Sequence, residues 1–409
     1  MTKEVYSLAE VADILGVSKE TLRRWDANGT LLSDRNADNN YRTYNKMQLE
    51  KFEQAQFIFS NEWVEEKLNE QTSNFSVLEL FAGAGGMALG LEKAGLKALM
   101  LNEIDRHACN TLRKNRPEWL VEEDDVSNID FTRFKNKVDV LAGGFPCQAF
   151  SYAGKKLGFE DTRGTLFFEF ARAVKETSPK IILAENVRGL LSHDEGRTLT
   201  TIKEVIYDLG YELIEPRVMK AIFYKVPQKR ERLILIAIRK DLVGKAKFEW
   251  PSTYNKVLTL KDALKKGELY DSDVEESEGQ KYPKRKAEIL SMVPPGGYWR
   301  DLPIDIQKEY MLKSFYLGGG KTGMARRLSW DEPSLTLTCA PAQKQTERCH
   351  PEETRPLTVR EYARIQTFPD DWEFTEPISA KYKQIGNAVP VNLSFAIGNS
   401  IVKMLNDMK

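Results

Sequence analysis

A glycine-rich turn between an apolar strand and a helix constrains the fold of this chain more than any other feature. Residues 75–80 (Phe-Ser-Val-Leu-Glu-Leu) predict a buried strand, and the turn Phe-Ala-Gly-Ala-Gly-Gly follows at 81–86. Glycines at such a turn let a ligand approach the backbone near the positive end of the next helix. The next predicted strand, 98–101, leads to Glu103, about 20 residues after the glycines, where a carboxylate can accept hydrogen bonds from a ribose. The combination predicts an α/β fold that binds an adenosine-containing cofactor, and it fits NAD and S-adenosylmethionine equally well.

A cysteine follows the next buried-strand pattern. The apolar residues 138–142 run into a glycine-bordered loop, Gly-Gly-Phe-Pro-Cys-Gln-Ala-Phe-Ser-Tyr-Ala-Gly at 143–154, which contains Cys147. Open α/β sheets place reactive groups at the carboxyl ends of their strands, so Cys147 is a candidate nucleophile. The strand pattern 181–184 ends at Glu185, which would lie at the same edge if both strands are parallel neighbours. The alternative for Cys147 is a structural thiol, the commoner fate of a buried cysteine.

Composition narrows the classes of protein. Lys plus Arg and Asp plus Glu number 60 each in 409 residues, so any nucleic-acid binding must come from local basic surfaces. No segment reaches the roughly 18 uninterrupted apolar residues of a membrane span. The polar start of the chain lacks the apolar core of a signal sequence, so we expect a cytoplasmic protein that does not contact membranes. The four cysteines show no Cys-x-x-Cys spacing, which disfavours disulfides and a metal site.

The first 70 residues predict a small module separate from the α/β fold. A capping box over 7–10 starts a short helix, Gly16 ends it, and Ser18 can cap a second helix. Two short helices joined by a glycine-containing turn are typical of a helix-turn-helix, and residues 39–44 resemble the wing of MerR-like winged helices. The module, which ends in a predicted connector helix, is therefore expected to bind DNA, with a pure packing role as the alternative. Its expected DNA contacts are Arg23, Arg24 and Arg42.

Beyond about residue 240 the alternation of strands and helices stops. The following residues interleave aromatic and basic side chains with glycine-rich breaks, which suits a surface that meets phosphates and bases. Helical patterning returns near the end of the chain. These changes predict an N-terminal module, an α/β domain, an insert and a return to the α/β domain, at 1–70, 74–240, 241–350 and 351–409.

The sequence resembles the bacterial DNA (cytosine-5) methyltransferases from about residue 74 to the end of the chain. The motifs that carry the resemblance stand in the family's order: Phe-x-Gly-x-Gly-Gly at 81–86, Pro-Cys-Gln at 146–148, Glu-Asn-Val at 185–187, Gln-Lys-Arg-Glu-Arg at 228–232 and Gly-Asn-Ala-Val at 386–389. The resemblance implies a doubly wound, Rossmann-like domain that binds S-adenosylmethionine, and a smaller target-recognition domain, formed by the insert, across a cleft. The N-terminal module is a departure, because the minimal family core lacks it.

The resemblance also implies the chemistry. Carbon 5 of cytosine is too poor a nucleophile to accept a methyl group unaided, and addition of the Cys147 thiolate to carbon 6 would turn the ring into an enamine. Glu185 would hydrogen-bond to ring nitrogen 3 and protonate it. Arg232 would hold the cytosine carbonyl oxygen, with help from Arg230. Methyltransferases that act on a base within duplex DNA flip it out of the stack, so the target cytosine would be extruded.

The remaining site residues follow from the same resemblance. Phe81 would stack on the adenine of the cofactor, and Glu103 would bind its ribose. The full set implied for S-adenosylmethionine is Phe81, Gly83, Gly85, Glu103, Ile104, Asp125, Pro146, Leu166 and Asn387. The set implied for duplex DNA is Gln148, Ser151, Arg326, Arg327 and Thr336, the last in a Thr-Leu pair that recurs in recognition domains. The protein would act on duplex DNA as a monomer.

Rival functions explain less of the sequence. A nicotinamide-dependent dehydrogenase would explain the glycines and Glu103, but not Pro-Cys-Gln or the long insert. An RNA-directed relative is a second alternative, although the length of the insert favours duplex DNA. A non-enzymatic regulator that reads DNA through the N-terminal module is a third. The sequence therefore predicts a methyltransferase that protects host DNA from a cognate restriction endonuclease, with an N-terminal module that binds an operator.

Overall fold

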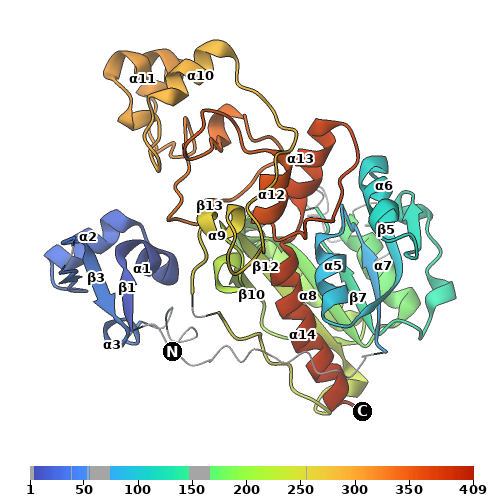
Figure 1. Ribbon diagram of the computed structural model, residues 1–409. Helices are drawn as coiled ribbons and strands as arrows, with labels where there is room; N and C mark the ends of the chain where they lie inside the picture. The colour runs from blue at the N-terminus through green and yellow to red at the C-terminus, as the bar shows by residue number, and fades with distance from the viewer. Residues whose placement is uncertain (1–3, 38, 53–54, 56–73, 147–165, 255) are drawn as a thin grey trace.

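The computed structural model describes residues 4–37, 39–52, 55, 74–146, 166–254 and 256–409. Figure 1 shows a small N-terminal module at the left, an α/β domain at the lower right and an upper part that carries two helices of the insert. The chain returns from the upper part and ends in a long helix beside the sheet. The helices of this path are α10 (Lys284–Ser291), α11 (Ile304–Met311), α12 (Val359–Ile365), α13 (Ile378–Asn387) and α14 (Val391–Asp407).

Among the described residues, the α/β domain contains an eight-stranded sheet with the order β10-β12-β8-β7-β4-β5-β6, and β9 pairs with β12 off this path. The strands from β4 to β8 are parallel to their neighbours, whereas β12 runs antiparallel to β8, β9 and β10. The strands are β4 (Ser76–Leu80), β5 (Lys97–Glu103), β6 (Val121–Glu123), β7 (Val140–Gly143), β8 (Ile181–Val187), β9 (Tyr211–Leu213), β10 (Arg217–Lys220) and β12 (Glu231–Arg239).

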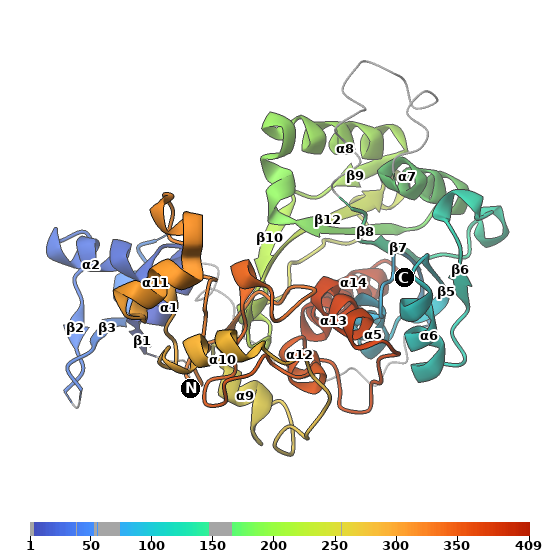
Figure 2. The same ribbon diagram turned by 90° about the horizontal axis from the view of Figure 1, so that it is seen from above.

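Helices cover both faces of this sheet, which explains why its central strands are apolar on both sides. The flanking helices are α5 (Gly86–Lys93), α6 (Arg106–Asn115), α7 (Leu166–Thr177) and α8 (Arg197–Asp208). Helices α5 and α14 pack over one set of strand residues, including Ala142 and Leu183. Helices α7 and α8 pack over the alternate set, including Leu141 and Ile182. Figure 2 shows the two helix layers on either side of the strands, and the predicted doubly wound, Rossmann-like fold is confirmed.

The last helix belongs to the core of the α/β domain. A glycine at position 90 lets α5 approach α14 closely, because an added Cβ would lie 2.5 Å from the carbonyl oxygen of Val391. By length and composition the helical stretch Ile378–Asp407, with a mean hydropathy of 1.3, could cross a membrane. However, 67% of its most apolar window is buried inside the protein, as in the core helix of a folded domain.

In its described residues, the N-terminal module contains three short helices and a three-stranded sheet with the order β1-β3-β2. Ser7 and Glu10 form the predicted capping box, and Gly16 ends the first helix with a φ of 69°. Ser18 accepts a hydrogen bond from the Thr21 amide at 3.0 Å and caps the second helix. Of the predicted connector, only its first turn lies within the described residues. The elements are β1 (Val5–Ser7), α1 (Leu8–Leu15), α2 (Lys19–Ala27), β2 (Asp34–Arg35), β3 (Arg42–Asn45) and α3 (Lys46–Leu49).

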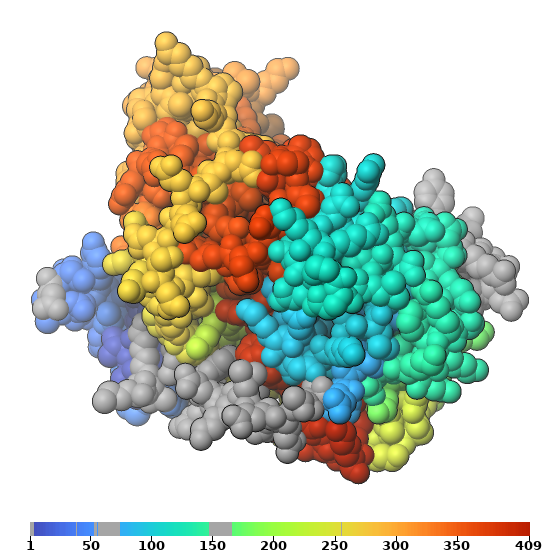
Figure 3. Space-filling view, turned by 45° about the vertical axis from the view of Figure 1, so that its right-hand side comes forward, coloured from blue at the N-terminus to red at the C-terminus, as the bar shows by residue number. Residues whose placement is uncertain are grey.

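The insert (residues 241–350) has a small apolar core of its own, which includes Trp299 and Met311. Its later part joins the α/β domain, because β13 (Ser334–Leu335) pairs in parallel with β11 (Gln228–Lys229). Another core extends from Ala82 and other residues of the α/β domain into α12 and α13. Figure 3 shows this C-terminal segment, in orange-red, between the yellow-orange insert and the cyan part of the α/β domain. The remaining helix of the insert is α9 (Leu260–Leu264).

One predicted strand is shorter than expected. The apolar pattern over 219–224 predicts a continuous strand, but β10 ends at Lys220 and a single 3-10 turn, η6 (Ala221–Phe223), follows. The ladder with β12 stops at the Lys220–Glu231 pair. The Ala221 amide then donates to the Arg230 carbonyl at 2.8 Å, which turns the chain inward and buries its apolar side chains.

Candidate active site

The pairing of β7 with β8 creates the edge at which the predicted catalytic groups meet. The two strands are parallel, and Gly143 is the register partner of Ala184. Glu185 is therefore one residue beyond the point where the chain leaves β7 for the cysteine loop. An added Cβ at Gly144 would lie 2.8 Å from Oε2 of Glu185, so the carboxyl group faces the start of that loop. The predicted residues Cys147, Gln148 and Ser151 lie outside the described part of the chain.

Glu185 forms an ion pair with Arg232 from the next strand. Nε of Arg232 and Oε1 of Glu185 are 2.5 Å apart, and each side chain is only 12% exposed. Arg232 reaches Glu185 because β12 runs antiparallel to β8, with Arg232 opposite Val187. Charges in such a poorly hydrated place interact much more strongly than on an open surface. The edge thus presents one carboxylate and one guanidinium side by side.

Buried contacts hold the beginning of the cysteine loop in place. The amide group of Asn186 donates a hydrogen bond to the Phe145 carbonyl at 2.8 Å. The Phe145 ring packs against Phe167 and Phe170 of α7, with ring centroids 5.1 and 5.6 Å away. Asn186 follows Glu185 directly in the chain, so one strand end fixes both the carboxylate and the loop base.

Arg230 is 2% exposed, and its two terminal nitrogens donate to main-chain carbonyls. It donates to Leu337 at 3.3 Å, to Gly386 at 2.9 Å and to Asn387 at 3.4 Å. Burial, with the like charge of Arg232, lowers the pKa of Arg230 to about 9. Arg230 thus ties the insert and the end of α13 to the edge that holds Glu185, and its help to Arg232 in catalysis stays a prediction.

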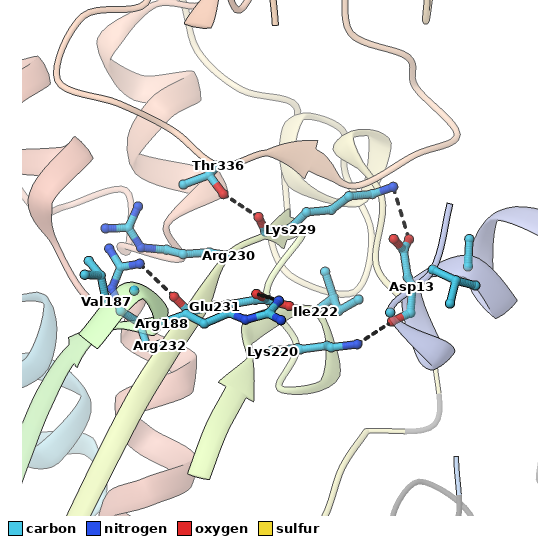
Figure 4. Close-up of a pocket in the computed structure, with 14 residues that line it drawn as sticks. Asp13, Val187, Arg188, Lys220, Ile222, Lys229, Arg230, Glu231, Arg232 and Thr336 are labelled. Atoms are coloured by element: carbon cyan, nitrogen blue, oxygen red, sulfur yellow. Dashed lines mark hydrogen bonds and ion pairs between the residues drawn. The ribbon is translucent and has the colours of Figure 1, made fainter. Parts of the chain in front are cut away.

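Thr336 lies where the insert is docked onto that edge. Its hydroxyl donates to the Lys229 carbonyl at 2.5 Å, and the Leu337 amide donates to the Gln228 side chain at 3.0 Å. Gln228 is buried and donates in turn to Gln366 of α12 at 2.9 Å. Figure 4 shows Thr336 together with Arg230 and Arg232 around one pocket. The sequence analysis missed Gln366, because nothing in its neighbourhood distinguishes it from a surface residue.

Glu103 organises the glycine-rich turn. Its Oε2 accepts a hydrogen bond from the Gly83 amide at 2.8 Å. Its Oε1 accepts from the amides of Ile104 and Asp105, at 2.9 and 2.8 Å. Each carboxylate oxygen can accept two hydrogen bonds, so Oε2 keeps capacity for a ribose hydroxyl. Gly85 has a φ of 88°, and an added Cβ there would lie 2.8 Å from Leu112, so the turn requires glycine.

The other predicted cofactor residues lie around this turn at the ends of neighbouring elements. Ile104 is 66% exposed, and Phe81 is half-buried at the end of β4. Asp125 follows β6 and accepts from the Ser127 amide and hydroxyl, and these hydrogen bonds lower its pKa. Asn387 is exposed at the end of α13. A carboxylate bonded to the glycine-rich turn, with apolar residues at the ends of neighbouring elements, fits an adenosine. Pro146 and Leu166, which border residues 147–165 outside the described part of the chain, are exposed and half-buried respectively.

Glu79 is a buried acid next to this site that the sequence analysis did not identify. It is 2% exposed in the middle of β4, and its Oε2 has no hydrogen-bond partner among the described residues. Burial raises its pKa well above the ordinary value, and the charge of Glu103 adds to the shift. The Glu79 carboxyl group therefore takes up a proton more readily than an exposed carboxyl group does. Its signal in the sequence is an acidic residue inside an otherwise apolar strand.

Two of the predicted DNA contacts make hydrogen bonds within the protein. The prediction for Arg327 is wrong, because this side chain is 3% exposed and donates to the Leu290 carbonyl and the Thr354 hydroxyl, both at 2.8 Å. Arg42 donates from Nε to Asp26 at 2.7 Å, which joins the wing to α2. Arg326 is half-buried.

The second helix of the N-terminal module does offer free basic groups. Arg23 and Arg24 are both exposed on α2. Arg23 makes one ion pair with Glu20 at 3.0 Å, with side chains 51% and 80% exposed, which binds it only weakly. The arginines that the sequence predicted to touch DNA on this helix are therefore accessible.

Gly144 provides a test of the geometry between the loop base and Glu185. We expect Gly144→Ala to lower kcat by about tenfold or more. The added methyl group must displace the Glu185 carboxylate that Arg232 holds, and small misplacements of catalytic groups slow the chemical step. The matched control is Gly189→Ala, where the nearest atom to the added Cβ is 4.0 Å away. Steady-state rates of both variants measure the effect, and equal rates would contradict the assigned contact.

Comparisons with known proteins follow the same division of the chain. The C-5 cytosine-specific DNA methylase family matches residues 75–403, and the MerR family of regulatory proteins matches residues 7–44. The chain is 79% identical to the Type II methyltransferase M.Eco47II of Escherichia coli, over 99% of this chain and 97% of that protein. It is 65% identical to M.PspPI of Psychrobacter sp. (strain TA137), over 98% and 96%.

Solved structures agree on the fold. DNMT2 of Spodoptera frugiperda, as a crystallised variant, superposes with a TM-score of 0.55 at 18% identity, over 82% of this chain and 99% of that one. The parallel sheet with its glycine-rich turn, the Glu185–Arg232 edge and the family match over 75–403 lead to one conclusion. The chain belongs to the C-5 cytosine-specific DNA methylase family, with a MerR-like module at its N-terminus.

Proposed function

We propose that this protein transfers a methyl group from S-adenosylmethionine to carbon 5 of a cytosine in duplex DNA. The observation that carries the proposal is the Glu185–Arg232 ion pair, which faces the base of the cysteine loop at Gly144. The family match and the Type II methyltransferases among the relatives support it.

The protein's own residues divide the work as follows. Cys147 adds through its thiolate to carbon 6, which raises the electron density at carbon 5. Glu185 in its protonated form donates a hydrogen bond and then this proton to ring nitrogen 3, and Arg232 binds the neighbouring carbonyl oxygen as negative charge develops there. S-adenosylmethionine supplies an electrophilic methyl group when it is bound. After methylation, loss of the carbon 5 proton expels Cys147 and restores the aromatic ring.

Access to carbon 6 requires the target cytosine to leave the duplex. A nucleophile cannot reach this atom inside a stacked base pair, so the base is flipped toward the sheet edge. The insert, residues 241–350, reads the surrounding sequence from the other side, and Thr336 joins it to the edge. Gln148 and Ser151 of the cysteine loop contact the opened strand, as does Arg326 of the insert.

The residues around the glycine-rich turn would hold the cofactor. Phe81 would stack on the adenine, Ile104 and Asp125 would contact it, and Glu103 would bind the ribose through the remaining capacity of Oε2. The backbone of Gly83 and Gly85 allows close approach. Pro146, Leu166 and Asn387 complete the pocket from the ends of the cysteine loop and of α13.

Glu103 gives the cofactor assignment a test. We expect Glu103→Ala to weaken binding of S-adenosylmethionine by roughly 10- to 100-fold, because it removes hydrogen bonds from a charged group and releases the Gly83 amide. Isothermal titration calorimetry with S-adenosylmethionine measures the change. Glu215→Ala, which removes an 88% exposed carboxylate between β9 and β10 at the opposite end of the sheet, is the control and should bind normally. Normal affinity in Glu103→Ala would contradict the assignment.

Bisulfite sequencing of DNA from a host that expresses the chain tests the function as a whole. One fixed sequence context should be protected from conversion, and the same host without the chain should show no protection there. Uniform conversion at all sites would contradict methylation of cytosine at carbon 5. The protected context also identifies the DNA sequence that the insert reads, which we expect to be the site of a cognate restriction endonuclease in the cytoplasm of the host.

The N-terminal module supports a second function, binding of an operator. The MerR match over residues 7–44 and the exposed Arg23 and Arg24 on α2 favour it. Footprinting with the full chain on the DNA upstream of its own gene should show a protected site that is lost in the Arg23→Gln/Arg24→Gln variant. Absence of any protected site would contradict operator binding and leave the methylation proposal intact.

A further inference from the structure

The end of α1 contacts two lysines of the catalytic domain. Nζ of Lys229 lies 3.1 Å from the Asp13 carboxylate, and these side chains are 24% and 16% exposed. Nζ of Lys220 donates to the main-chain carbonyls of Asp13 at 2.9 Å and of Ile14 at 3.4 Å (Figure 4). The lysines come from β10 and β11, so the N-terminal module is seated on the same side of the sheet as the catalytic edge.

This contact encloses a pocket that contains the catalytic arginine. The pocket has a volume of about 480 Å³. The module contributes Asp13 and Gly16 to its wall, and the catalytic domain contributes Lys229, Arg232 and Thr336. Figure 4 shows the module on one side and the arginines on the other. A group bound in this pocket would therefore touch both parts of the protein.

The module presents to these lysines the kind of charge that a DNA phosphate presents. Asp13 supplies a carboxylate, and the carbonyls at the C-terminal end of a helix carry partial negative charge. Lysine side chains are ordinary partners of phosphate oxygens in DNA complexes. Lys220 and Lys229 also line the same pocket as Arg232, which is proposed to bind the target base. They are therefore placed to bind a phosphate of the strand that carries this base.

The contact is also one that a better anion can replace. Burial raises the pKa of the Asp13 carboxyl group, and the nearby Lys229 opposes this shift only in part. Burial likewise lowers the pKa of Lys220. Burial thus disfavours the charged form of both groups, and neither the Asp13–Lys229 pair nor the contact of Lys220 with the helix end fully offsets this cost. A phosphate, which is always ionised near neutral pH, carries no such penalty from protonation.

We propose that Lys220 and Lys229 form a phosphate-binding site for the substrate strand, and that the end of α1 occupies this site in the DNA-free protein. Duplex DNA that enters the catalytic edge then displaces the N-terminal module, so the module acts as a reversible competitor of its own substrate. The inference rests on the proposed methylation of duplex DNA, and it adds a competition between the two DNA-facing parts of one chain.

A second ion pair at the same joint allows a test that leaves the catalytic residues and both lysines unchanged. Nζ of Lys19 on α2 lies 2.5 Å from Oε1 of Glu332 in the insert, with side chains 41% and 26% exposed. Reversal of either charge weakens the docking of the module, and reversal of both restores the pair. Lys19→Glu makes the protein more acidic, and Glu332→Lys makes it more basic. A general effect of net charge on DNA binding would therefore raise KM in the first variant and lower it in the second.

The experiment measures kcat and KM for a duplex that contains the methylated site. We expect Lys19→Glu and Glu332→Lys each to lower KM by about threefold with kcat unchanged, because a partly exposed ion pair contributes little free energy. The double variant should return to the wild-type KM. Lys403→Glu, which breaks the exposed Lys403–Glu249 pair elsewhere in the catalytic domain, is the matched control.

Opposite shifts of KM in the two single variants, an increase in both or no change in either would overturn the proposal. An increase in both would mean that the docked module assists substrate binding. Failure of the proposed function is distinguishable from these outcomes, because the wild-type chain would then methylate no duplex at all.

Discussion

Replacing Cys147 with serine should abolish methyl transfer while DNA binding remains. A hydroxyl group is far less ionised than a thiol near neutral pH, so the attack on carbon 6 that activates the ring is lost. Loss of a covalent nucleophile lowers rates by orders of magnitude, and we expect a fall of at least about 10³-fold. Transfer of a labelled methyl group from S-adenosylmethionine to duplex DNA measures the rate, and a gel-shift assay measures binding.

The control for this variant is Cys339→Ser. Cys339 is an exposed thiol whose Sγ donates to Asn387 at 3.1 Å, and a serine hydroxyl can make the same hydrogen bond. Its activity should stay near that of the wild type. Methyl transfer at the wild-type rate in Cys147→Ser would refute covalent catalysis by this residue.

Arg232→Ala should produce the second large loss, a fall in kcat of about 10²- to 10³-fold. The change removes the donor proposed to bind the cytosine carbonyl oxygen. It also leaves Glu185, whose side chain is 12% exposed, without the cation that lies 2.5 Å away. Both effects act on the charge that develops on the ring during attack. Single-turnover methylation with saturating DNA and S-adenosylmethionine isolates the chemical step.

Arg239→Ala is the matched control, because Arg239 stands at the other end of the same strand, β12, and pairs with Asp241 on the surface. It should leave kcat near the wild-type value. Thermal unfolding of both variants checks that the α/β domain stays folded. An Arg232→Ala enzyme with normal single-turnover rates would mean that the Glu185–Arg232 pair is structural.

The sheet and its edge could be predicted because buried parallel strands have a simple sequence pattern. Buried strands are continuous apolar runs, and the residues that follow them gather at one edge. Residues 75–80 and 181–184 were such runs, and their ends deliver the glycine-rich turn and Glu185 to that edge. The pattern failed at 219–224, where the same apolar character belongs to a strand end and a buried 3-10 turn.

The roles of individual arginines could not be read in the same way. Arg326 and Arg327 are neighbours in a basic segment, yet only Arg327 is buried and spends its donors on carbonyls of the insert. Arg230 and Arg232 are two residues apart, and one ties the insert to α13 while the other pairs with Glu185. Which guanidinium turns inward depends on carbonyls far away in the chain.

The joint between the N-terminal module and the catalytic domain had no sequence signal at all. Asp13 and Lys229 lie in separate segments, and although Lys229 belongs to the Gln-Lys-Arg-Glu-Arg motif, nothing in that motif predicts its pairing with Asp13. Only the folded arrangement brings them together beside Arg232. The same holds for Gln228 and Gln366, whose buried hydrogen bond joins the catalytic edge to α12.

A duplex that carries fluorine at carbon 5 of the target cytosine tests covalent catalysis most directly. Once the methyl group is in place, the ring is restored only if carbon 5 loses a cation, and fluorine cannot leave as one whereas a proton can. Incubation with S-adenosylmethionine should therefore trap the protein on the DNA, and mass spectrometry of the digested adduct should place the bond at Cys147. Absence of an adduct under conditions that methylate the unfluorinated duplex, or an adduct at another residue, would contradict the account.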